Sequence, residues 1–140
     1  MIQRAIADTG PLVAFLDRAE RYHRWVGQRI AELEAPLLVC EPVLAEAMFL
    51  LARSGKGQDA LFGLLESGAL RIGLQVADHV VALRTLHRKY ANRPMSLADA
   101  CIVRMSELHD GHAVLTLDSD FTIYRKHGSQ ELTLIQPGSV

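Results

Sequence analysis

Cysteine is scarce in this sequence of 140 residues, which contains only Cys40 and Cys101. The two are far apart, both have apolar neighbours, and neither belongs to a C-x-x-C pair of the kind found in redox or zinc motifs. We therefore expect two reduced thiols in the core of an intracellular protein, and no structural disulfide. A small secreted fold held together by disulfides is excluded.

Long hydrophobic runs and a dominant charge are absent as well. The most apolar stretch, residues 36–52, contains Glu41 and Glu46 and is too polar for a membrane span of about 20 apolar residues. The first apolar residues are interrupted from Gln3 onward, so no secretory signal is predicted. The net charge of −1, from 15 basic and 16 acidic residues, excludes a strongly basic coat for nucleic acid. We expect a cytoplasmic protein without membrane association.

Apolar residues make up 49% of the chain, which is enough for the core of one domain covering residues 1–140. Short apolar runs alternate with segments of helical periodicity, a pattern that predicts an α/β fold with a mostly parallel sheet. The expected strands are residues 2–7, 37–40, 70–75, 113–117 and 132–135. The expected helices are residues 22–33, 42–53, 57–66, 76–90 and 97–108.

Four acidic residues stand where expected strands end or the next helices begin. Asp8 follows the first strand, and Glu46 lies one turn into the helix after the second. Asp99 lies in the first turn of the helix at 97–108, and Asp118 follows the fourth strand. Because the carboxyl ends of parallel strands meet at one edge of a sheet, we expect these four carboxylates to converge there.

Each acid by itself has a structural explanation that the sequence leaves open. Asp8 is suited to capping a helix, and Ser96 with Asp99 has the spacing of a capping box. Asp118 could cap a helix that begins near Asp120, and Glu46 could be a solvated residue on a helix surface.

The joint pattern favours a metal site over four separate caps. Carboxylates placed together repel one another unless a cation lies among them, and hard oxygen ligands suit Mg²⁺ or Mn²⁺. These ions accept phosphate oxygens as further ligands and promote phosphodiester hydrolysis without a covalent nucleophile.

Four motifs, in this order, carry a resemblance that covers nearly the whole chain: DTGPLVAFLD, CEPVLAEAMFLL, PMSLADACIVRMSE and VLTLDSDF. Together they closely resemble the PIN-domain ribonucleases, particularly the VapC-type toxins of bacterial toxin–antitoxin pairs. The resemblance implies a three-layer α/β/α fold with a central, mostly parallel sheet. It implies Mg²⁺ or Mn²⁺ as cofactor, RNA as substrate, an antitoxin protein as partner, and a homodimer.

The resemblance also assigns roles to individual residues. It implies that the four acids are both the catalytic residues and the metal ligands, with Asp120 as a candidate auxiliary acid, and that three hydroxyl residues help to hold the carboxylates or a water. The acids are Asp8, Glu46, Asp99 and Asp118, and the hydroxyl residues are Thr9, Ser96 and Thr116.

Three functions remain as hypotheses. The leading one is a metal-dependent endoribonuclease, because the acidic set is complete. The second is a non-catalytic PIN-like module that binds RNA or a protein. The third is a phosphatase of the haloacid-dehalogenase type, but its D-x-D motif should follow the first strand, where this chain has Asp8-Thr9-Gly10.

Overall fold

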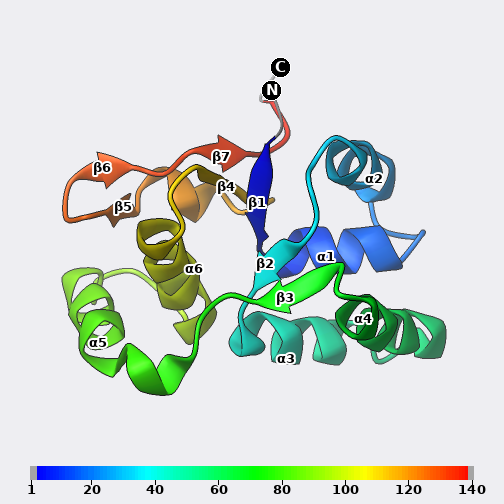
Figure 1. Cartoon of the computed structure of the whole chain (residues 1–140), viewed down its shortest axis with the longest axis horizontal. Coiled ribbons are helices and arrows are strands. Elements are labelled where there is room, and N and C mark those ends of the chain that lie inside the picture. The colour runs from blue at the N-terminus through cyan, green and yellow to red at the C-terminus, as the bar shows by residue number, and fades with distance from the viewer. Residues whose placement is uncertain (1–2, 139–140) are drawn as a thin grey trace.

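The computed structural model describes residues 3–138, and in this range five parallel strands form one sheet in the order β3-β2-β1-β4-β7 (Figure 1). The predicted parallel sheet is therefore confirmed. A separate antiparallel hairpin, β5 (Arg125–Lys126) with β6 (Gln130–Glu131), was not expected. The strands of the main sheet are β1 (Arg4–Ala7), β2 (Leu37–Val39), β3 (Leu70–Ile72), β4 (His112–Leu115) and β7 (Leu134–Ile135).

Helices cover both faces of this sheet, which confirms the three-layer α/β/α arrangement. Helices α1, α2 and α4 lie to one side of the sheet and α5 and α6 to the other, while α3 contacts both α1 and α6 (Figure 1). No helix within residues 3–138 is long and apolar enough to cross a membrane. The helices are α1 (Thr9–Leu16), α2 (His23–Ala31), α3 (Glu41–Leu50), α4 (Gly55–Ser67), α5 (Val80–Lys89) and α6 (Leu97–Leu108).

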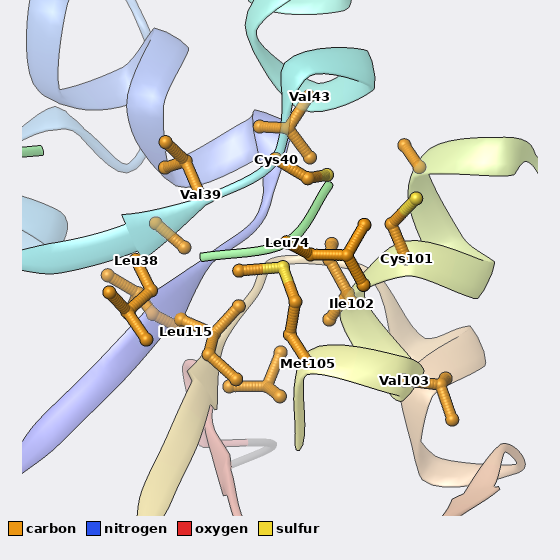
Figure 2. Close-up of a cluster of buried hydrophobic side chains, with 14 of the residues drawn as sticks. Leu38, Val39, Cys40, Val43, Leu74, Cys101, Ile102, Val103, Met105 and Leu115 are labelled. Carbon is orange, nitrogen blue, oxygen red and sulfur yellow. The ribbon is translucent and has the colours of Figure 1, made fainter. Parts of the chain in front are cut away.

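The core lies on both faces of the sheet, and one part of it is between the sheet and α6, where side chains of β2 and β4 meet Ile102 and Met105 (Figure 2). Apart from Arg4 at the start of β1, the residues of β1 and β2 are buried because helices cover both faces, which explains their apolar runs. Cys40 and Cys101 are buried free thiols in this core, as predicted. The neighbouring Cys101 thiol, together with burial, raises the pKa of Cys40.

Several expected elements have other bounds in the structure, among them the strand expected over 70–75, which ends at Ile72, and the helix expected over 42–53, which ends at Leu50. The helix expected over residues 76–90 is interrupted at His79, whose backbone is not helical, so a short 3₁₀ helix, η1 (Val76–Asp78), precedes α5. The imidazole of His79 accepts a hydrogen bond of 3.2 Å from Arg104, a tertiary contact that holds this break. The strand expected over residues 113–117 ends at Leu115. Ile2, expected in the first strand, lies outside the described residues.

Candidate active site

A cleft of about 490 Å³ lies at the carboxyl edge of the sheet, and all four predicted acids line it. Asp8 follows β1, Glu46 lies on α3, Asp99 lies in the first turn of α6, and Asp118 follows β4. The expected convergence of these side chains is therefore present. Asp120 does not line the cleft, but its backbone N–H donates to Asp118 Oδ1 at 2.9 Å, and its role as an auxiliary acid stays a prediction.

Asp8 is the buried centre of the cleft. Its side chain is 7% exposed, and its Oδ1 accepts a hydrogen bond of 2.8 Å from the backbone N–H of Thr9, which caps α1. Its Oδ2 accepts a bond of 2.8 Å from the hydroxyl of Thr116. The same hydroxyl oxygen accepts the backbone N–H of Asp118 at 2.9 Å, which turns the chain out of β4. Thr116 therefore connects two of the four acids.

Glu46 is connected to the same centre through a second hydroxyl group. The Thr9 hydroxyl donates a hydrogen bond of 3.0 Å to Oε2 of Glu46. Glu46 is exposed on α3, and this bond directs its carboxylate toward the N-terminus of α1. Two of the three hydroxyl residues that the resemblance indicated thus hold carboxylates of the cleft directly.

Asp99 is held by the N-terminus of its own helix and by one distant residue. Ser96 and Asp99 form the expected capping box, with the Asp99 N–H at 3.0 Å from the Ser96 hydroxyl and the Ser96 N–H at 3.3 Å from Asp99 Oδ2. The phenol of Tyr124 donates a further bond of 3.1 Å to the same Oδ2. The contact joins residues 25 positions apart, and no spacing in the sequence indicates it.

Asp118 also has a capping role, as the sequence allowed. Its Oδ1 accepts the backbone N–H of Asp120 at 2.9 Å and caps the short 3₁₀ helix η2 (Ser119–Thr122). Three of the four acids thus accept backbone N–H groups at helix starts while they line the cleft. Asp8, Asp99 and Asp118 therefore cap helices and line the cleft at the same time.

The cleft is electrostatically unfavourable for four ionised carboxylates. Burial raises the pKa of Asp8 from its ordinary value of 3.8 to about 6, although the hydrogen bonds from Thr116 and Thr9 oppose this rise. The charges of Asp99 and Asp118 raise it further. Burial also raises the pKa of Asp99, against the opposing effect of its bonds from Ser96 and Tyr124. A bound cation would relieve this repulsion.

The donor set fits a partly hydrated divalent ion. Its ligand atoms are carboxylate oxygens, which suit Mg²⁺ and Mn²⁺. Among residues 3–138, no three His, Cys, Asp or Glu side chains are close enough to hold an ion between them. Mg²⁺ does not require such a cage, because it commonly keeps several waters and is held by one or two carboxylates with substrate phosphates.

A parallel α/β sheet with acidic residues at its carboxyl edge defines the structural class, and comparison with known proteins identifies the family. A model of the PIN domain matches residues 5–126, and the chain belongs to the PIN-domain family. Its sequence is also similar to Ribonuclease VapC26 of Mycobacterium tuberculosis, with 30% identity over 134 residues. That match covers 93% of this chain and 98% of the relative. The resemblance to VapC-type PIN proteins is thereby confirmed.

The first prediction concerns the pH dependence of stability without metal. The folded-state pKa of Asp8, about 6, lies above its ordinary value of 3.8, so folding favours the protonated form by about 3 kcal/mol. The wild type should therefore lose stability as the pH rises from about 4 to 6. Asp8→Asn cannot ionise and remains a good N-cap, so its stability should depend less on pH and exceed that of the wild type at pH 7.5.

Thermal unfolding in a chelator at several pH values measures this difference, with Asp59→Asn, an exposed site on α4, as the matched control. Saturating Mn²⁺ should then raise the melting temperature of the wild type more than that of Asp8→Asn. Parallel pH profiles and equal metal-induced shifts for the two proteins would contradict the prediction.

Proposed function

We propose that this chain is a metal-dependent endoribonuclease and the toxin of a toxin–antitoxin pair. The observation that carries the proposal is the meeting of four carboxylates, from four separate segments of the chain, in one cleft at the carboxyl edge of the sheet. The similarity to a protein named as a ribonuclease supports RNA as the substrate.

In this proposal Asp8, Glu46, Asp99 and Asp118 hold Mg²⁺ or Mn²⁺. When bound, the ion supplies Lewis-acid stabilisation of the phosphate charge and activates water for hydrolysis. The protein contributes a rigid set of anionic ligands, because hydroxyl and backbone N–H groups fix Asp8, Glu46 and Asp99. No side chain of the cleft needs to act as a covalent nucleophile.

The second prediction tests this activity directly. The purified protein should cleave total RNA in Mg²⁺ or Mn²⁺, and excess chelator should abolish the cleavage. Asp99→Asn and Glu46→Gln each remove a ligand charge while keeping side-chain size, and each should lower the cleavage rate by about 100-fold. Glu41→Gln is the matched control, because Glu41 is exposed on the same helix as Glu46 and does not line the cleft.

Three results would contradict the proposal. Cleavage that persists in excess chelator would exclude the metal, and undiminished rates in both variants would exclude the acids. Binding of RNA without cleavage under all conditions would favour the non-catalytic PIN-like module instead.

We also propose that an antitoxin protein inhibits the chain at this cleft. Two large apolar side chains near the end of α3 support this proposal, since Phe49 is 79% and Leu50 is 49% exposed. Leu50 lines the acidic cleft, and both residues line a shallow apolar depression that also includes Glu46. An apolar peptide segment with an arginine suits this combination, because its guanidinium can bind carboxylates in place of a metal ion.

The third prediction concerns this partner. The protein encoded by the neighbouring open reading frame should copurify with the chain on co-expression and should inhibit RNA cleavage. Phe49→Ser should weaken the complex at least tenfold without loss of RNA cleavage, because an exposed aromatic anchor contributes to binding but not to the fold. Phe62→Ser, at an exposed position on α4, is the control. A nuclease that neither binds nor is inhibited by this protein would contradict the prediction.

A homodimer is the remaining part of the proposal. An apolar groove lies between α5 and α6 and is lined by Val80 and Leu97, which are 55% and 52% exposed. The adjacent Val81 is 82% exposed. Exposed aliphatic residues gathered on one face are typical of protein interfaces, and a second copy of the chain could cover this groove.

The fourth prediction tests the dimer. The wild type should have twice the mass of one chain in light scattering coupled to gel filtration. Val80→Asp should shift it to the monomer, because Val80 lines the groove and a charge there would become buried in the interface. Phe62→Ser, whose site lies away from the groove, should remain dimeric. A monomeric wild type would show that the groove is not a homodimer interface.

A further inference from the structure

Tyr124 lies directly behind Asp99, outside the cleft. Its side chain is fully buried, at 0% exposure, and its hydroxyl donates a hydrogen bond of 3.1 Å to Asp99 Oδ2. The residue follows η2, the 3₁₀ helix capped by Asp118. The segment from Asp118 to Tyr124 therefore begins at one acid of the cleft and ends with a hydrogen bond to another, Asp99.

An aromatic cluster holds the Tyr124 ring in place. The ring packs edge to face against Tyr90, with centroids 5.0 Å apart, and against Phe121 at 5.2 Å. Its backbone N–H donates to the carbonyl of Asp120 at 3.3 Å. The position of the phenol is thus set by packing, and the hydrogen bond to Asp99 is not a chance contact of a mobile side chain.

The hydrogen bond from Tyr124 makes the two carboxylate oxygens of Asp99 different from each other. Oδ2 accepts from both the Tyr124 hydroxyl and the Ser96 N–H, whereas Oδ1 accepts no hydrogen bond from any residue in the range 3–138. The terminal torsion of an aspartate is broad when nothing restrains it. Two donors on one oxygen restrain this torsion and leave Oδ1 available to a cation in the cleft that Asp99 lines.

We propose that Tyr124 is a positioning residue for metal binding, which fixes the Asp99 carboxylate so that Oδ1 meets the ion. The phenol acts only through Asp99 and touches neither the ion nor RNA. This inference rests on the proposed metal-dependent function. It is supported by the chemistry of the phenol, because a tyrosine hydroxyl is a hydrogen-bond donor that suits a carboxylate oxygen.

Tyr124→Phe tests the proposal because it removes one oxygen atom and keeps the ring. Hydrogen bonds to charged groups are strong, so we expect the Kd for Mn²⁺ to rise roughly tenfold. Free Mn²⁺ measured by electron paramagnetic resonance gives this Kd without RNA. In cleavage assays, half-maximal activity should need about tenfold more Mn²⁺, while kcat at saturating Mn²⁺ should stay within about twofold of the wild type.

Tyr90→Phe is the matched control. Tyr90 belongs to the same cluster, but its hydroxyl accepts the backbone N–H of Arg125 at 2.8 Å and contacts no acid of the cleft. A purely structural role of these phenols would lower the melting temperature of both variants and leave Mn²⁺ affinity unchanged in both. We expect the Mn²⁺ affinity to fall in Tyr124→Phe alone.

A measurement on the wild type keeps the test independent of how well the variant folds. Mg²⁺ bound at Asp99 withdraws charge from the carboxylate, so a Mg²⁺ titration should change the near-ultraviolet tyrosine absorbance. The change should persist in Tyr90→Phe.

If wild type and Tyr124→Phe bind Mn²⁺ equally, or if Mg²⁺ binds without an absorbance change, the positioning role is wrong and the proposed function stands. If the wild type binds neither ion, the metal-dependent function itself is wrong, and this inference with it.

Discussion

The parallel pairing of β1 with β4 is the constraint on which the cleft depends. Its register places Ala7 opposite Leu115, and the backbone N–H of Asp8 continues the ladder with a bond of 3.0 Å to the Leu115 carbonyl. The next side chains, Asp8 and Thr116, then meet at the strand ends and form their hydrogen bond. A shift of one strand by one residue would turn its side chains to the other face of the sheet, so Asp8 and Thr116 would no longer meet. The core that fixes this register therefore also fixes the site.

Helix capping explains how the chain tolerates several carboxylates in one place. Asp8, Asp99 and Asp118 each accept a backbone N–H at the start of a helix, where the peptide dipoles provide partial positive charge. This charge offsets part of the repulsion before any cation binds. Helix capping and metal binding both use the side-chain oxygens of these residues, so a helix cap at these positions does not argue against a role in metal binding.

The sequence predicts those elements of the fold that have strong local signals. Helix α6 begins after its Ser96 capping box and spans Leu97–Leu108 as expected. The strand order was not predictable, because pairing among parallel strands depends on the packing of helices between them. The hairpin of β5 and β6 has two residues per strand, too few to show a period. Asp8, Asp99 and Asp118 were found because each stands at or near an element boundary, and Glu46 because it lies in the helix that follows the second strand. Tyr124 was missed because only tertiary packing brings it to Asp99.

The topology has a consequence for synthesis on the ribosome. Asp8 and Glu46 belong to the first half of the chain, with β1, β2 and β3, whereas Asp99 and Asp118 come with α6 and β4. Domains generally fold as units, so this one cannot complete its sheet before β4 has emerged. The first half alone presents two of the acids and lacks Thr116, so it cannot form the buried centre of the cleft. A nascent or truncated chain without β4 thus carries an incomplete site, and the full acidic set arises only near the end of translation.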